Sequence, residues 1–401
     1  MQPAARLAAV IDILAALEKT PEPADKVLRE FFRARRYAGS KDRAAVAERL
    51  YTVLRHYYSY AWRMNSTEPR ALVIASLLAE NAAPEEFFTG TAYSPAALSD
   101  DERDAIAAVP EAAPRHVQGE FPAWLEPELE KAFGADLLAE MAAMQERAAV
   151  DIRVNTLKTS RDALIDALAS EGFNAAPTPH AETGLRLSGT ATSKLSASPL
   201  FTSGQFEFQD EAAQRAAALC GATPGARVLD YAAGAGGKTL ALAAAMHNKG
   251  AIVAHDIDSG RLSMLEPRAT RAGATIIKIS TAAPSGTFDI VLLDAPCSGT
   301  GTWRRQPELR VRLTAERLAS LTALQAELLP KAAAFVKTGG RLVYATCSVL
   351  RCENEALIAA FCTAHPEFTP VPVSPAETFF RASPHRTATD GFFTAILQRT
   401  S

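Results

Sequence analysis

Residues 288–305 read Phe-Asp-Ile-Val-Leu-Leu-Asp-Ala-Pro-Cys-Ser-Gly-Thr-Gly-Thr-Trp-Arg-Arg, and this stretch decides how the second half of the chain is interpreted. Its apolar run, residues 290–293, is typical of a fully buried strand, and the run stops at a carboxylate, Asp294. Cys297 follows in a loop of Ser, Gly and Thr that can lie close to a ligand. The pattern predicts a site for chemistry at the end of a buried strand.

Strands and helices alternate around this stretch, from residue 206 to residue 401. We expect strands at residues 227–230, 251–255, 275–279, 288–293 and 341–345, helices between them, and a late antiparallel strand at 392–397 along one edge. This spacing predicts an α/β domain with a Rossmann-like, mostly parallel sheet and helices on both faces. Such sheets bind ligands at the carboxyl ends of their strands.

Composition limits what the chain can be. A net charge of −3 over 401 residues excludes an evenly basic nucleic-acid binder, so any such contact depends on a local patch. Five cysteines without a Cys-x-x-Cys pair favour free thiols in the cytoplasm and argue against a metal site. No apolar stretch is long enough to span a membrane. We expect a cytoplasmic monomer.

Two smaller domains are expected before the sheet: an all-helical domain at residues 1–112 and a small α/β module at 113–205. Residues 26–63 of the helical domain carry ten basic side chains against three acidic ones, with tyrosines interleaved. Arg35 and Arg36 lie in this segment, which therefore predicts contact with RNA. A solvated basic face of a helical bundle is the alternative.

A loop of small residues follows the first strand of the sheet, at residues 231–239. Ala232 stands where a P-loop needs its first glycine, and Thr239 stands where a dinucleotide fingerprint needs its third. A nucleoside without a pyrophosphate remains, and Asp256 at the end of the second strand can accept hydrogen bonds from ribose hydroxyls. S-adenosylmethionine fits this pattern. The alternative is a tight strand-to-helix turn whose glycines serve packing alone.

Two cysteines follow the ends of two strands that are expected to be neighbours, Cys297 after the fourth and Cys347 after the fifth. They should meet over one cleft. Cytosine C5 becomes nucleophilic when a thiolate adds to C6, and a carboxyl group such as that of Asp294 can assist at N3. A second cysteine near C5 suits the release step. The other three cysteines, Cys220, Cys352 and Cys362, are interpreted as small hydrophobic residues.

Several motifs together resemble the Sun (Fmu, NOL/NOP/Sun) family of RNA cytosine-C5 methyltransferases. They are residues 294–305, Thr346-Cys-Ser348, residues 230–239, Asn354-Glu355 and Asp390-Gly-Phe-Phe393. The N-terminal helices resemble the NusB-type RNA-binding domain of the bacterial 16S rRNA enzyme of that family.

The resemblance implies roles for some of the matching residues. The family's nucleophile corresponds to Cys347 and its release cysteine to Cys297, with Asp294 and Lys238 beside the reaction. Cofactor contacts would come from Ala232, Ala233, Gly234, Ala235, Gly236, Gly237, Lys238, Asp256, Arg261 and Asp294, and RNA contacts from Arg304, Arg305, Arg35 and Arg36. The implied activity is S-adenosylmethionine-dependent methylation of cytosine C5 in RNA, most naturally 16S rRNA.

The chain departs from the family pattern at the end of the third strand. Ser280 and Thr281 stand where the family commonly has Gly-Asp, whose carboxylate holds the adenine amino group. A hydroxyl would make that hydrogen bond more weakly. Two alternatives therefore stay open: a tRNA cytosine-C5 methyltransferase, or a non-catalytic RNA-binding assembly factor with a degenerate cofactor site.

Overall fold

The computed structural model describes residues 1–109 and 111–401, and the chain divides into two compact units. A helical unit comprises Met1–Glu146 together with Trp303–Leu313, and a sheet unit comprises Arg147–Thr302 together with Thr314–Ser401. This division differs from the three domains expected from the sequence. The small α/β module groups with the large sheet, and the eleven-residue segment Trp303–Leu313 groups with the helices.

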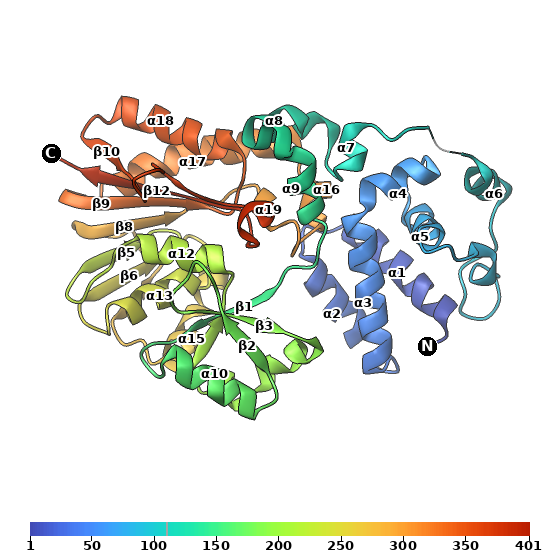
Figure 1. Cartoon of the computed structure of the whole chain (residues 1–401), viewed down its shortest axis with the longest axis horizontal. Helices are drawn as coiled ribbons and strands as arrows, with labels where there is room; N and C mark the ends of the chain where they lie inside the picture. The colour runs from blue at the N-terminus through green and yellow to red at the C-terminus, as the bar shows by residue number, and fades with distance from the viewer. Residues whose placement is uncertain (110) are drawn as a thin grey trace. The chain divides into compact units, whose positions relative to one another are not determined.

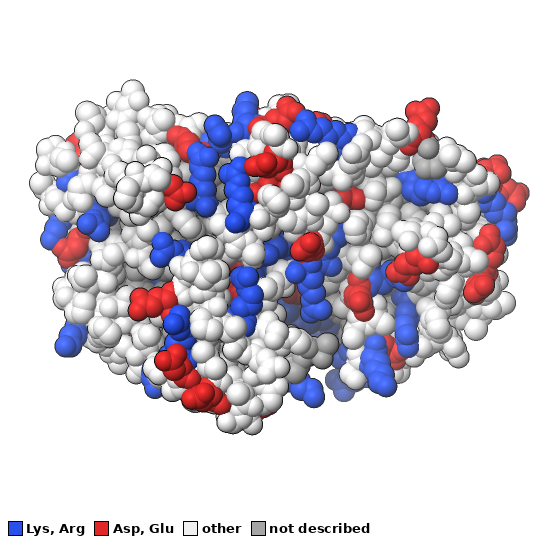
Figure 2. Space-filling view, in the orientation of Figure 1, with Lys and Arg blue, Asp and Glu red and all other residues white. Residues whose placement is uncertain are grey.

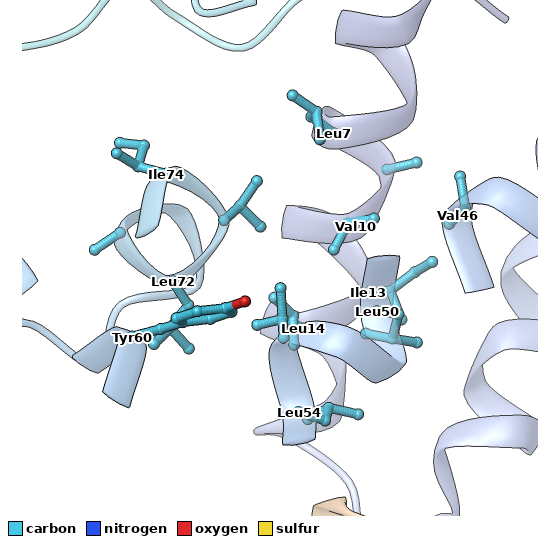
Figure 3. Packing of buried hydrophobic residues seen from close by; sticks show 14 of the residues in the cluster. Leu7, Val10, Ile13, Leu14, Val46, Leu50, Leu54, Tyr60, Leu72 and Ile74 are labelled. Carbon is cyan, nitrogen blue, oxygen red and sulfur yellow. The ribbon is translucent and has the colours of Figure 1, made fainter. Parts of the chain in front are cut away.

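The helical unit is built from short amphipathic helices. They are α1 (Pro3–Leu17), α2 (Ala24–Arg33), α3 (Ser40–Arg55), α4 (Tyr57–Met64), α5 (Pro69–Leu78), α6 (Asp100–Ala107), α7 (Arg115–Gln118), α8 (Glu126–Phe133), α9 (Leu137–Ala143) and α16 (Glu308–Arg312). One apolar face of each of α1, α3 and α5 meets the others in a common core (Figure 3). Val10, Ile13 and Leu50 in that core are fully buried. The all-helical prediction for this region is confirmed.

The segment that contains α16 is fastened into the helical unit through the ends of other helices. The Arg312 guanidinium donates to four carbonyls at 2.9–3.3 Å, at the end of α1 and in the loop that leads to α2. They belong to Leu17, Thr20, Pro21 and Glu22. The Glu308 carboxylate accepts the backbone N–H of Ala24, at 3.0 Å, where α2 begins. Charged side chains thus satisfy backbone groups that helix ends leave open.

The small module of the sheet unit is a four-stranded antiparallel sheet in the order β2-β3-β1-β4. Its elements are β1 (Val150–Val154), α10 (Arg161–Ser170), β2 (Asn174–Pro177), β3 (Gly184–Ser188), α11 (Pro199–Thr202) and β4 (Phe206–Phe208). The expected α/β character of this module is confirmed. Strand β2 is mostly exposed, and β4 is three residues long.

The large sheet has the order β10-β12-β9-β8-β5-β6-β7, with β11 paired to β12. Its strands are β5 (Arg227–Asp230), β6 (Ala251–His255), β7 (Ile277–Ser280), β8 (Phe288–Asp294), β9 (Val336–Thr346), β10 (Phe368–Val371), β11 (Phe380–Ala382) and β12 (Phe392–Arg399). Strands β7, β6, β5, β8 and β9 run parallel. Strand β8, which the opening stretch predicted, is central and almost wholly buried.

Helices cover both faces of this sheet (Figure 1). They are α12 (Glu211–Leu219), α13 (Gly237–Ala245), α14 (Ser259–Leu262), α15 (Leu265–Ala272), α17 (Ala315–Ala333), α18 (Glu355–Ala364) and α19 (Pro384–Thr387). One core places α17 and α18 against β8 and β9, and a second places α12 and α13 on the other face. The predicted Rossmann-like architecture is confirmed.

The sequence pattern predicts the late strand at one edge of the sheet, but the structure places it inside the sheet. Strand β12 is antiparallel, as expected, but it pairs with β9 on one side and with β10 on the other. The reason for the error is that β10 is four residues long and contains a proline, so its pattern resembles a loop. No helix in the described ranges is long and apolar enough to cross a membrane.

Candidate active site

The two cysteines that follow β8 and β9 lie side by side. These strands pair in parallel, with Asp294 opposite Ala345, so both chains leave the sheet at the same edge. Cys297 and Cys347 then approach until their sulfur atoms are 3.4 Å apart. The backbone N–H of Gly301 donates to the Cys347 carbonyl at 2.9 Å and holds the two loops together. The expectation that these thiols meet is confirmed by this distance.

Cys297 is held in its thiol form. Its pKa lies well above the ordinary value because of the hydrogen bond with Cys347 and burial, with further contributions from the negative charges of Cys347 and Glu353. A neutral thiol can donate a proton, whereas it is a weak nucleophile. By contrast, Cys220 is fully buried, and its pKa of about 12 agrees with its interpretation as a hydrophobic residue.

An ion pair lies beside the cysteines. Lys238 Nζ is 2.6 Å from Asp294 Oδ2, and the ammonium also faces the Phe392 ring at 4.8 Å from its centroid. Burial is the largest single effect and lowers the pKa of Lys238, but the charge of Asp294, its hydrogen bond and the charges of Cys347 and Asp230 together outweigh burial and raise the pKa. The raised pKa favours the charged form of the lysine. The Asp294 side chain keeps 35% of its surface exposed, so a substrate can reach it.

The Gly-rich loop between β5 and α13 is shaped by glycines at φ values that other residues avoid. Gly234 has φ 53° and Gly236 has φ 82°. A Cβ atom on Gly234 would stand 2.5 Å from the Arg261 guanidinium, and one on Gly236 would stand 2.1 Å from the Leu265 side chain. The loop therefore lies directly against α14 and α15, and only glycine fits at these two positions.

Asp256 anchors the Gly-rich loop from the end of β6. Its carboxylate accepts the backbone N–H of Gly234 at 2.7 Å and that of Asp258 at 2.8 Å, and the side chain is buried. Each oxygen has a further lone pair, so the predicted contact with a ribose remains chemically open. The contact itself stays a prediction.

Two arginines that sequence reasoning did not assign to this loop hold its carbonyl groups. Arg268 Nη1 donates to Ala235 O at 2.6 Å, and Arg153 Nη1 donates to Gly237 O at 2.8 Å. These carbonyls are thereby satisfied by protein, and the loop is held in one conformation. The two arginines come from α15 and β1, far from the loop in sequence, so no local pattern could have identified them.

Asp230 indicates whether the residues around the Gly-rich loop could bind a cofactor. Its Oδ2 atom accepts the Thr239 hydroxyl at 2.6 Å, whereas its buried Oδ1 atom has no hydrogen-bond partner in the described structure. Burial raises its pKa to about 7. An orphaned carboxylate oxygen at the start of a glycine loop fits a ligand with an ammonium or hydroxyl group. The residues present therefore fit the predicted nucleoside cofactor.

The end of the third parallel strand, β7, differs from the family pattern as the sequence indicated. The Ser280 hydroxyl donates to Ala282 O at 3.3 Å, and the Ser280 carbonyl lies 3.0 Å from His255 Nδ1. The hydroxyl oxygen can still accept a hydrogen bond from a ligand. Thr281 is exposed.

The four arginines predicted to contact RNA differ in how far they are exposed to solvent. Arg304 is only 6% exposed and Arg305 is half-buried, within the segment that belongs to the helical unit. Little of the Arg304 side chain is therefore available for direct contact with RNA, and that contact stays a prediction. Arg35 pairs with Asp12 at 3.8 Å and stacks over Phe31, whereas Arg36 is exposed. Arg36 remains the better candidate.

Basic and acidic side chains are interspersed over the face shown in Figure 2. In residues 26–63, Lys26 and Arg49 form ion pairs, and Arg63 donates to two backbone carbonyls. Arg29, Arg33, Arg36 and Lys41 are exposed. Some of the basic side chains in this segment are therefore engaged in contacts within the protein. The exposed ones lie on α2 and in the residues that follow it. Over residues 1–109 and 111–401 no cluster of His, Cys, Asp or Glu suited to a metal occurs.

Comparisons with known proteins agree with this geometry. The family model described as 16S rRNA methyltransferase RsmB/F matches residues 218–398, and the RsmF/B-like ferredoxin-like domain matches residues 121–193. A probable ribosomal RNA small subunit methyltransferase B of Synechocystis sp. is 35% identical over 301 residues, covering 70% of this chain and 67% of the relative. A protein of the same description from Bacillus subtilis is 34% identical, covering 62% of this chain and 59% of the relative. The chain thus spans about two thirds or less of these relatives.

Solved structures share the fold. The crystal structure of PH0851 covers 100% of this chain with a TM-score of 0.82 and 28% identity, and 99% of that chain is covered. A methyltransferase homolog from Pyrococcus horikoshii covers 71% with a TM-score of 0.63 and 28% identity, and 97% of that chain is covered. Fold and site together define a Rossmann-like methyltransferase. Within that class, the chain belongs to the 16S rRNA methyltransferase RsmB/F family.

Proposed function

We propose that this protein methylates C5 of a cytosine in 16S rRNA, with S-adenosylmethionine as the methyl donor. The observation that carries the proposal is the 3.4 Å approach of the Cys297 and Cys347 sulfurs, beside the ion pair of Lys238 and Asp294. Relatives named ribosomal RNA small subunit methyltransferase B or F support the substrate class. Identity is 35% to a type B relative and 32% to a type F relative, so the particular cytosine remains open.

The cofactor would be held by the Gly-rich loop at residues 232–238, with Asp230 and Asp256 offering acceptors and Arg261 packed against the loop. S-adenosylmethionine supplies an electrophilic methyl group. The orphaned Oδ1 atom of Asp230 supports the assignment, because a buried acceptor without a donor is costly unless a ligand satisfies it.

The chain's own residues then make C5 reactive. Cys347 adds through its sulfur to C6, and the electron pair of the C5–C6 double bond becomes available at C5. A proton taken up from solvent bridges N3 and the Asp294 carboxylate during this addition, because both atoms are acceptors and the charge that the thiolate brings to the ring must be neutralised at N3. The negative charges of Asp294 and Cys347 both act on the Lys238 ammonium and raise its pKa.

Release requires two bonds to break once C5 carries its methyl group. The C5 proton leaves to solvent, the double bond re-forms, and the sulfur–C6 electron pair returns to Cys347. We assign stabilisation of the departing thiolate to a hydrogen bond from Cys297, because its sulfur is 3.4 Å away and its raised pKa keeps the proton on Cys297.

Loss of the C5 proton can be measured directly. RNA that carries tritium at cytidine C5 should release tritium to water when incubated with the enzyme and S-adenosylmethionine. We expect no release with Cys347→Ala, and unchanged release with Cys362→Ala, a partly buried thiol on α18. Release from transfer RNA and not from 16S rRNA would move the substrate to the alternative class.

The rival function, an RNA-binding assembly factor without cofactor, is motivated by Ser280 at the end of β7. Calorimetric titration separates the two. Heat of binding at about 1 mM S-adenosylmethionine, a concentration that reveals even weak sites, supports the enzyme. Absence of heat together with unimpaired RNA binding would favour the assembly factor.

A further inference from the structure

One buried carboxylate lies beneath both cysteine loops. Glu353 ends a short 3-10 turn, Arg351–Glu353, and its side chain is fully buried. Its Oε1 atom accepts the backbone N–H of Ser298 at 2.8 Å and the Gln325 side-chain amide at 2.9 Å. Its Oε2 atom accepts the hydroxyls of Ser298 and Ser348. Four neutral donors thus satisfy one buried carboxylate.

The positions of these donors connect the carboxylate to the chemistry. Ser298 directly follows Cys297, and Ser348 directly follows Cys347, so Glu353 holds the loop after β8 and the loop after β9 at once. The serine hydroxyls also lie 3.3 Å from each other, and Thr300 joins them at 3.1–3.2 Å. The separation of the two sulfurs therefore depends on a network with Glu353 at its centre.

The charge of Glu353 also acts on Cys297. Among the described residues, the titratable groups that act on this thiol are Cys347 just after β9, Tyr344 on β9 and Glu353 in the 3-10 turn. The hydrogen bond with Cys347 and burial raise the pKa of Cys297 most, and the negative charge of Glu353 raises it further. A nearby anion opposes formation of a second anion.

We propose that Glu353 is a positioning residue that holds the Cys297 and Cys347 loops at their working separation. The inference rests on the proposed function, because it explains how two sulfurs are assigned different roles. Because Glu353 is fully buried, we do not expect it to contact the substrate. It acts through Ser298 and Ser348, and its charge favours the protonated Cys297 thiol, which can donate a hydrogen bond to Cys347.

The kinetic test uses two variants of the full chain. Glu353→Gln keeps the shape but removes the charge and one acceptor, whereas Glu355→Gln removes a carboxylate two residues away that pairs with Arg381. We expect Glu353→Gln to lower kcat by up to about 100-fold, because small misplacements of reacting groups cost this much, with KM nearly unchanged. Glu355→Gln should keep wild-type kcat. Equal kcat values for the two variants would overturn the proposal.

A second readout separates positioning from mere stability, and it does not need the methylation reaction. In a Cys347→Ala background, the rate of iodoacetamide alkylation of Cys297 is followed against pH by peptide mass spectrometry. Addition of Glu353→Gln should move the midpoint of that profile to lower pH, and addition of Glu355→Gln should leave it in place. An unmoved midpoint in a folded Glu353→Gln protein would contradict the role of its charge. Because this shift can be measured even if wild-type protein methylates no RNA, failure of the proposed function and failure of this inference are distinguishable.

Discussion

Asp230 combines a buried carboxylate, an oxygen atom without a partner and a pKa raised to about 7. Such a group destabilises the folded state, because burial disfavours its charged form. Its location at the start of the Gly-rich loop explains why it is retained: the cost falls when a ligand donates to the free oxygen.

Asp230→Asn should therefore stabilise the ligand-free protein at alkaline pH. The carboxyl group ordinarily titrates near 3.8, whereas in the folded chain it titrates near 7. Between these values the folded state holds a proton that the unfolded state releases, so stability falls as pH rises and the loss is complete above about pH 7. The variant lacks this loss.

The measurement compares the urea midpoints of wild type and variant at about pH 5.5 and about pH 8, with the variant gaining on wild type at the higher pH. Each unit of pKa shift corresponds to about 1.4 kcal/mol, so the gain should reach at least that size. Cofactor affinity should fall in the same variant. A midpoint difference that does not change with pH would refute the burial argument.

The residues closest to the chemistry could be found from sequence. Cys297 and Cys347 each follow a buried strand, and parallel neighbours bring such positions together, so their approach was predictable. Arg304 could not be placed in this way. Its burial depends on packing within the helical unit, which no spacing along residues 294–305 reveals. Glu353 was missed because its partners lie on three other segments.

At the scale of elements, the turn from β5 into α13 depends on Gly236. An alanine there would adopt a left-handed conformation that costs about 1–2 kcal/mol. Its Cβ would also stand 2.1 Å from the side chain of Leu265, which is fully buried on α15. Displacing a packed leucine adds about 1–3 kcal/mol.

Gly236→Ala should therefore lower the melting temperature and abolish detectable binding of S-adenosylmethionine. Gly339→Ala is the matched control, because Gly339 has φ 76° but nothing lies within 4 Å of an added Cβ. Differential scanning calorimetry should show the larger loss for Gly236→Ala. Equal losses would mean that backbone strain alone matters and that the contact with Leu265 does not.

The central elements of the large sheet were predictable, whereas its far edge was not. Strands β5, β6 and β8 and the second half of β9, residues 342–345, contain short apolar runs, and this pattern follows from burial on both faces. Strand β10 contains a proline, and β11 has only three residues. Segments β10 and β11 form strands because they pair with β12, and not because of their local amino-acid composition.

At the scale of the whole molecule, each compact unit is built from two separate stretches of the chain. The segment Trp303–Leu313 leaves the catalytic sheet six residues after Cys297 and belongs to the helical unit. Sequence reasoning expected a continuous helical domain ending at residue 112. The return of a distant segment to that domain rests on side chains such as Arg312, whose partners are about 290 residues away.

Arg312→Ala should loosen the helical unit at the point where this segment enters it. The variant loses a guanidinium that donates to four backbone carbonyls, and charge-assisted hydrogen bonds contribute about 1.5–3 kcal/mol each at most. Hydrogen exchange of a peptide spanning residues 14–24 should become faster. Arg317→Ala removes an equal charge at an exposed site and should leave the exchange unchanged. Identical protection in both variants would contradict the fastening role of Arg312.

The most direct test of the account is the fate of RNA on a variant that adds to cytosine but cannot release it. Cys297→Ala, incubated with S-adenosylmethionine and 16S rRNA, should yield a protein–RNA adduct that survives denaturing electrophoresis, and mass spectrometry should place the cytosine on the peptide that contains Cys347. The double variant Cys297→Ala/Cys347→Ala should yield none. Clean release of RNA by Cys297→Ala, or an adduct on any cysteine other than Cys347, would contradict the proposed division of labour between the two sulfurs.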